Sequence, residues 1–187
     1  MILNSIKYTD DKRYLNVIIN RPLDVIKTIF LTILPEYGFV VREEQIKLSQ
    51  NMYLGLTGKQ VAICEAEVGA GKTLAYLIAS FVAKERYTAE YGFSLPVTIS
   101  TSSIELQKMI VEKEVPQLSR MLQDYGLIKH PLSAVVRKGK EHYFCKARCY
   151  DYLNKLMEHK EKYQKLLDYF MVNKIAVRAF DLDTWDM

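Results

Sequence analysis

The chain has 187 residues, of which 49% are apolar and 26% charged, which is the composition of an ordinary folded domain. Its 13 tyrosines and 7 phenylalanines argue against a disordered chain, and a net charge of +4 is too small to establish a nucleic-acid partner. The odd number of cysteines, the lack of a signal-peptide pattern and the short apolar runs near the N-terminus predict a cytoplasmic protein with reduced thiols and no membrane span.

The first 35 residues are predicted to form an N-terminal appendage made of a strand and an amphipathic helix. Arg13 to Ile19 is rich in apolar and β-branched residues, which favours a strand. Asn20 is predicted to cap the helix that follows, with Pro22 in its first turn. The helix is expected over 23–34 because apolar residues recur there at helical spacing: Leu23, Ile26, Phe30 and Ile33.

Residues 36–139 alternate between predicted helices and predicted strands. The helices are expected over 42–54, 73–84 and 104–126, the last with a break at Pro116, and the strands over 60–64, 96–100 and 133–136. Such alternation predicts an α/β fold, with a parallel sheet covered by helices on both faces. One or two further helices are expected over 145–173.

A glycine-rich motif lies between the strand predicted over 60–64 and the helix that follows it. It matches the pattern GxxxxGK[ST] at every position except the first, where Ala66 stands. Gly69 and Gly71 allow backbone N–H groups to turn towards a phosphate, and the positive end of the next helix faces the same point. The sequence therefore predicts binding of ATP, for which the alternative is a chance glycine-rich turn. The predicted binding residues are Ala66, Glu67, Val68, Gly69, Ala70, Gly71, Lys72 and Thr73.

Two of these side chains carry the predicted chemistry. Lys72 is expected to reach the β- and γ-phosphates, and the hydroxyl of Thr73 is expected to bind Mg²⁺. They are the catalytic residues that the motif predicts.

A basic segment lies near the C-terminus. Between Arg137 and Lys165 there are nine Lys or Arg residues against four Asp or Glu, so the remainder of the chain is close to neutral. Several tyrosines are interleaved with these charges, a pattern that suits a single-stranded phosphate backbone with stacked bases. A solvated helix face is the alternative.

Four segments, taken in order, resemble superfamily 2 helicases of the DinG and XPD/Rad3 type. Residues 66–73 resemble motif I, and residues 42–45 (Arg-Glu-Glu-Gln) resemble the R-x-x-Q element that precedes it. Residues 98–107 are similar to motif Ia, and residues 137–145 to the segment that leads into an iron–sulphur cluster, with Lys140 in place of Arg and His142 in place of Asn. The resemblance covers about 42–153 and implies the ATP-binding part of an ATP-dependent DNA helicase acting in DNA repair or replication, with a RecA-like P-loop fold.

The resemblance also implies roles for residues outside the loop. Gln45, together with Arg42, is expected to bind the adenine edge, because an amide donates and accepts hydrogen bonds at once. A second set of residues is expected near single-stranded DNA: Ser100, Thr101, Gln107, Arg137, Lys138 and Lys140. Residues 36–139 would be the front half of the ATP-binding domain, and residues 140–187 the start of the iron–sulphur and helical insertion.

Cys145 matches the first of four cluster ligands in iron–sulphur members of the family. A [4Fe–4S] cluster needs four thiolates, whereas Cys64 is expected in the core and only Cys149 remains as a second candidate. Cys145 is therefore predicted to bind a cluster only in a longer parent protein and to be a free thiol here. A zinc site made of His142, Cys145 and Cys149 is the alternative.

The hydrolytic machinery of the family is expected to be incomplete in this chain. Residues 175–183 are the only apolar run that ends in acids, but they lack the adjacent acids of the D-E-x-H motif and contain Arg178. The second motor domain is also missing, so weak nucleotide binding with little turnover is expected from a truncated or complemented protein. The alternatives are a P-loop kinase, a non-catalytic module that binds single-stranded nucleic acid, and an unstable fragment.

Overall fold

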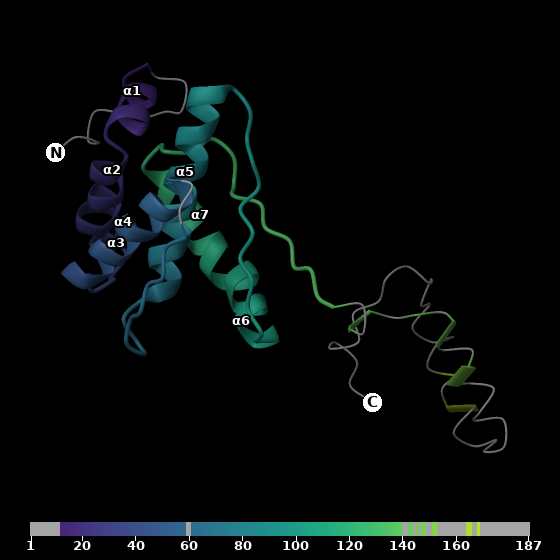
Figure 1. The fold of residues 1–187 in the computed structure, drawn as a ribbon. Coiled ribbons are helices and arrows are strands. Elements are labelled where there is room, and N and C mark those ends of the chain that lie inside the picture. The colour runs from purple at the N-terminus through teal and green to yellow at the C-terminus, as the bar shows by residue number, and fades with distance from the viewer. Residues whose placement is uncertain are drawn as a thin grey trace. The chain divides into compact units, whose positions relative to one another are not determined.

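The computed structural model describes residues 12–58, 61–139, 142, 143, 145, 147, 148, 151, 152, 164, 165 and 168. The chain divides into two compact units, residues 1–136 and 137–187. The elements of the first unit are helical (Figure 1): α1 Lys12–Asn20, α2 Pro22–Thr28, the π-helix η1 Ile29–Ile33, α3 Leu34–Glu36, α4 Glu43–Thr57, α5 Lys72–Tyr91, α6 Ile104–Met109, the π-helix η2 Ile110–Glu114 and α7 Val115–Asp124.

The first element corrects a sequence prediction. Residues 13–19 were expected as a strand but belong to helix α1. Tyr14 and Ile18 lie one helical turn apart and are 1% and 0% exposed, so a helix buries both on one face. Asn20 is the last residue of α1 and not the cap of the next helix, since Arg21 occupies the N-cap position of α2.

The two π-helical segments each end directly before a helix that has proline near its start. Pro35 follows η1 in α3, and Pro116 follows η2 in α7. Proline has no N–H to donate and its ring clashes with the carbonyl four residues back, so the wider π-turn accommodates it without ending the helix. The break predicted at Pro116 is therefore wrong, and the chain stays helical from Ile104 to Asp124.

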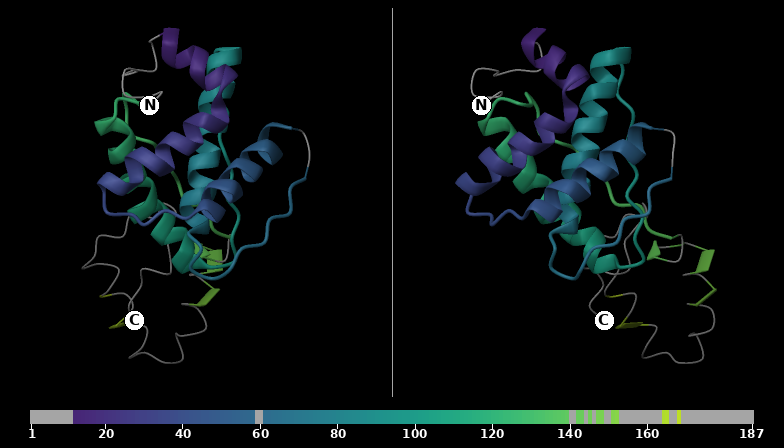
Figure 2. Two further views of the ribbon diagram at one scale, coloured as in Figure 1. Left: turned by 90° about the vertical axis from the view of Figure 1, so that its left-hand side faces the viewer. Right: turned by 60° about the vertical axis from the view of Figure 1, so that its left-hand side comes forward.

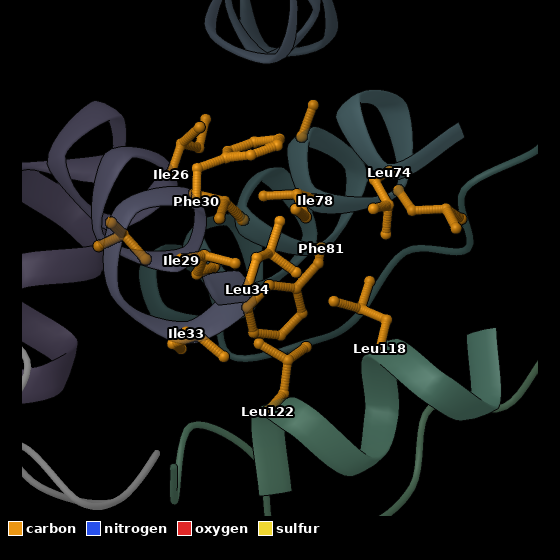
Figure 3. Packing of buried hydrophobic residues seen from close by; sticks show 14 of the residues in the cluster. Ile26, Ile29, Phe30, Ile33, Leu34, Leu74, Ile78, Phe81, Leu118 and Leu122 are labelled. Atoms are coloured by element: carbon orange, nitrogen blue, oxygen red, sulfur yellow. The ribbon is translucent and has the colours of Figure 1, made fainter. Parts of the chain in front are cut away.

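Helix α5 runs through the middle of the first unit (Figure 2) and packs against α1, α2, α4 and η2. Its buried residues are apolar or small: Leu74, Ala75, Leu77, Ile78, Ala79, Phe81 and Val82. Figure 3 shows Ile78 and Phe81 between the side chains of α2 and η1 on one side and Leu118 and Leu122 of α7 on the other. The core is thus a helix-on-helix core built around α5.

The predicted parallel sheet and RecA-like fold are wrong for the part of the chain that the structure describes, which is helical and contains no sheet. The segments 61–64, 96–100 and 133–136 are irregular there. Strands are stable only when neighbouring strands take their backbone hydrogen bonds, and the core is already closed by helices. The apolar side chains that suggested strands lie in solvent instead, with Val61, Ile63 and Val135 exposed by 91%, 94% and 81%.

None of the helices in the described ranges is long and apolar enough to cross a membrane.

Candidate nucleotide-phosphate site

The glycine-rich loop leads directly into the N-terminus of α5. Gly69 and Gly71 have φ angles of 83° and 73°, in the left-handed region that glycine adopts without steric cost. The N–H of Ala70 donates to the carbonyl of Glu67 at 3.2 Å, which closes the turn between them. The loop therefore has the two backbone reversals that the sequence motif predicted.

The start of α5 presents unpaired backbone donors. Gly71 is the N-cap residue, with no side-chain cap, and its carbonyl accepts the N–H of Ala75 at 3.2 Å. The N–H groups of Lys72, Thr73 and Leu74 precede that bond and have no acceptor within the helix. Because α5 is 20 residues long, its N-terminus carries the partial positive charge of a full helix dipole. This arrangement suits an anion such as a phosphate group.

The side chain of Lys72 lies across the loop. Its Nζ donates to the carbonyl oxygens of Ala66 at 2.7 Å and Glu67 at 3.0 Å. Both bonds are exposed, and a phosphate oxygen would be the stronger acceptor because it is charged. Thr73 is half-buried one residue further on, beside Tyr76, where burial raises the pKa of the Tyr76 phenol and the Thr73 side chain opposes that rise.

Helix α4 holds the loop from behind. Gln45 is 6% exposed, and its Nε2 donates to the carbonyl of Gly71 at 3.1 Å. A Cβ atom on Gly71 would lie 2.0 Å from this nitrogen, so glycine is needed there for space as well as for φ. Arg42 is exposed at the N-cap of α4, where its carbonyl accepts the N–H groups of Gln45 and Ile46.

Two further polar residues of α4 were not singled out from the sequence. The hydroxyl of Ser49 donates to the carbonyl of Ala75 at 2.9 Å, and the hydroxyl of Tyr53 accepts a bond from Arg86 Nη1 at 2.8 Å. Gln45, Ser49 and Tyr53 follow one another at intervals of four residues, and all three bond to α5 or to its N-cap residue. That spacing is visible in the sequence as a polar stripe on a helix, although only the structure identifies its partner.

The residues predicted near single-stranded DNA surround the start of α6. Thr101 Oγ1 accepts the N–H of Ser103, and Gln107 Nε2 donates to the carbonyl of Thr101 at 3.3 Å. Ser103 caps α6 by accepting the N–H of Leu106. Ser100 lines an open groove of about 570 Å³, between the C-terminal part of α4, α5 and residues 97–99. The structure joins Thr101 and Gln107 by a hydrogen bond beside the cap of α6 and places Ser100 in the groove.

The remaining predicted residues belong to the second unit. Arg137 is exposed, and the backbone N–H of Lys138 donates to the hydroxyl of Tyr143 at 3.0 Å. Lys140 lies outside the described residues. Contact between the basic segment and DNA therefore remains a prediction.

The cysteines are only partly described. Cys64 is half-buried against the core of the first unit. Backbone and side-chain hydrogen bonds with Arg148 lower the pKa of Cys145, whereas Cys149 lies outside the described residues. Within the residues that are placed, no group of three or more His, Cys, Asp or Glu side chains is arranged to hold a metal ion. A cluster role for Cys145 stays a prediction.

Three curated relatives, each named 3′-5′ exonuclease DinG, resemble the chain. The protein of Bacillus subtilis is 32% identical over 131 residues, which is 70% of this chain and 12% of the relative. Those of Staphylococcus saprophyticus and Staphylococcus aureus strain USA300 are 30% and 29% identical over 118 residues, 63% of this chain and 12% of each relative. No family model and no solved structure matches the chain.

The loop belongs to the class of sites in which a glycine turn places a lysine and a threonine at the start of a long helix. Over the matched region the chain is related to DinG-type proteins, which confirms the resemblance inferred from its motifs. The chain spans about 12% of the length of the curated relatives it matches.

Proposed function

We propose that residues 66–73 bind the phosphates of ATP with Mg²⁺, and that the chain is the nucleotide-binding part of a DinG-type ATP-dependent DNA helicase that acts in repair or replication. The observation that carries the proposal is the turn at Gly71, which sets Lys72 and Thr73 at the positive end of α5. The relationship to DinG-type proteins supports the same function.

The residues present fit the group that they would hold. The N–H groups of residues 72–74 and the Lys72 ammonium supply donors for phosphate oxygens, and the Thr73 hydroxyl supplies an oxygen ligand of the kind that Mg²⁺ prefers. Bound Mg²⁺ would neutralise charge on the phosphates. Gln45, with Arg42 beside it, is proposed to face the adenine end of the nucleotide.

Single-stranded DNA is the proposed partner. Ser100, Thr101 and Gln107 would lie along its backbone, because hydroxyl and amide groups at a helix start are good phosphate ligands. Arg137, Lys138 and Lys140 would supply charge from the basic segment. A [4Fe–4S] cluster, held in part by Cys145, is proposed only for a longer protein.

The substitution Lys72→Ala tests nucleotide binding. Because Lys72 is exposed and supplies the charged donor of the loop, we expect the variant to keep its free energy of unfolding and to lose at least tenfold in affinity for a fluorescent ADP measured with Mg²⁺. Lys27→Ala, which removes an exposed lysine from α2, is the matched control and should bind as the unsubstituted chain does. Equal affinity in the two variants would refute the proposed site.

The alternative is a DNA-binding module that does not use nucleotide, and a DNA-binding measurement distinguishes it from a helicase part. A helicase part should change its affinity for fluorescent oligo(dT) when Mg²⁺ and a non-hydrolysable ATP analogue are added, since the two sites would be coupled. Salt-dependent DNA binding that ignores the nucleotide would favour the module.

A further inference from the structure

Helix α4 contacts the carbonyl groups of α5 in matched register. Gln45 bonds to the carbonyl of Gly71 and Ser49 to the carbonyl of Ala75, so residues four apart on one helix bond to residues four apart on the other. A shift of α5 by one residue along its axis, or a rotation of its first turn, would break both bonds. The pair of bonds therefore fixes the register of α5 against α4.

Ser49 is the more deeply buried of the two donors. It is 0% exposed, and its hydroxyl has the Ala75 carbonyl as its partner at 2.9 Å. A buried hydroxyl without a partner is costly, so this bond holds whenever the two helices are packed. Gln45 is also buried, at 6% exposed, and its amide bonds to the carbonyl of Gly71 directly before the helix.

The two anchored carbonyls flank the first turn of α5, which would face a bound phosphate. The N–H groups of residues 72–74 lie between Gly71 and Ala75 in the chain, within the first helical turn. The first turn of a helix frays more readily than its middle, because its N–H groups lack intrahelical partners. A contact at Ala75 limits that fraying from the buried side while the exposed side stays open to a ligand.

We propose that Ser49 is a positioning residue of the phosphate site, which orients the first turn of α5 by holding the Ala75 carbonyl. This inference rests on the proposed function, because it assigns Ser49 to the same site. The hydrogen bond of the Ser49 side chain goes to Ala75, beyond the residues that would bind the phosphate. It acts through Ala75 on the direction of the N–H groups that precede it.

Ser119 offers a matched control. It is a buried serine on α7, 2% exposed, whose hydroxyl accepts the N–H of Leu132 at 2.9 Å. We expect Ser49→Ala and Ser119→Ala to lower the urea midpoint to a similar degree. Only Ser49→Ala should also weaken binding of fluorescent ADP with Mg²⁺, by roughly three- to tenfold, the range that one net hydrogen bond spans.

A second measurement needs no nucleotide. Amide hydrogen exchange of Ala75, whose N–H donates to the carbonyl of Gly71, should be faster in ligand-free Ser49→Ala and unchanged in Ser119→Ala. Ser49→Cys, which keeps most of the side-chain volume with a weaker donor, covers the case in which the alanine variant does not fold, and it should change both measurements in the same direction.

The outcomes separate this inference from the proposed function. Absence of ADP binding by the unsubstituted chain, or binding that Lys72→Ala leaves intact, would overturn the proposed function and, with it, the assignment of Ser49 to that site. Binding that is lost in Lys72→Ala but equal in the Ser49 and Ser119 variants, with equal exchange, would overturn only the role of Ser49.

Discussion

Gly71 meets two requirements for glycine, of which Gly69 and Gly92 share only the first, a positive φ. Its φ of 73° disfavours any Cβ atom, and the amide of Gln45 occupies the space where that atom would lie. Gly92, at the other end of α5, has a φ of 77° with nothing within 4 Å of its Cβ position. Comparing the two glycines therefore separates the effect of backbone strain from the effect of a side chain packed close to the glycine.

The substitution Gly71→Ala is expected to destabilise the chain more than Gly92→Ala. Both variants incur the left-handed strain of about 1–2 kcal/mol. Gly71→Ala should lose about 1 kcal/mol more in the free energy of unfolding, because it displaces the buried Gln45 amide from its acceptor. Urea denaturation measures both values.

The background variant Gln45→Ala shows whether that excess comes from the amide. With the Gln45 side chain removed, Gly71→Ala should cost no more than Gly92→Ala. If Gly71→Ala still cost more free energy of unfolding than Gly92→Ala in this background, the close contact at Gly71 would have to come from another part of the loop.

At the scale of elements, the ends of α3 and α7 are joined by two tyrosine–carboxylate pairs. The hydroxyl of Tyr37, just after α3, donates to Asp124 at the end of α7. A hydrogen bond to Glu36 of α3 raises the pKa of Tyr125, just after α7, to about 12, and the bond to Asp124 raises the pKa of Tyr37 to about 12 as well. Each helix end thus supplies one donor and one acceptor.

These pairs predict a loss of stability at high pH. A tyrosine donates only while protonated, and its pKa is about 10 in the unfolded chain and about 12 here. The contribution of the pairs is therefore complete below pH 10 and is lost as the pH rises from 10 to 12. The double variant Tyr37→Phe with Tyr125→Phe should lose less stability over that interval than the unsubstituted chain, measured by urea denaturation.

Exposure limits the size of this effect. Because Tyr37 is exposed, we expect its pair to contribute less than about 1 kcal/mol at pH 7. Tyr87→Phe, which keeps the ring contacts with Tyr91 and Phe93, is the control and should follow the unsubstituted chain. Identical pH profiles for all three proteins would contradict the assignment.

The helices of the first unit could be predicted from the sequence more fully than the segments between them. Apolar residues at helical spacing located α2 with η1, and the sequence also located α4 and most of α5, because the apolar side chains of these helices form the core. Residues 61–64 and 96–100 have strand-like compositions, but a strand depends on a neighbouring strand that local sequence does not specify. Residues 13–19 were assigned to a strand from their composition, although they lie in helix α1, which buries Tyr14 and Ile18.

The residues of the candidate site also differ in how far the sequence alone predicts their arrangement. Gly69, Gly71 and Lys72 were predictable because a local backbone conformation fixes their arrangement. The contact of Ser49 with Ala75 joins residues 26 positions apart, and it depends on how α4 packs on α5. Periodicity identifies the polar stripe on α4 but not the helix that it contacts.

At the scale of the whole first unit, apolar surface is concentrated outside the helices. Val61 and Ile63 lie before the glycine-rich loop, Val97 and Ile99 before α6, and Val135 near the end of the unit, with exposures from 39% to 94%. Single exposed apolar residues are ordinary in folded proteins, whereas several on irregular segments form surface that favours association. We therefore expect this surface, and not the helical core, to govern the solubility of the chain.

The double substitution Val61→Lys with Ile63→Lys tests this expectation. Both side chains are more than nine-tenths exposed, so the free energy of unfolding should change by less than about 0.5 kcal/mol. Binding of a hydrophobic dye and concentration-dependent association in sedimentation should both decrease. Leu31→Lys, an exposed position on η1, is the control and should leave both measurements unchanged. Unfolding of the double variant would contradict the exposure of these two side chains.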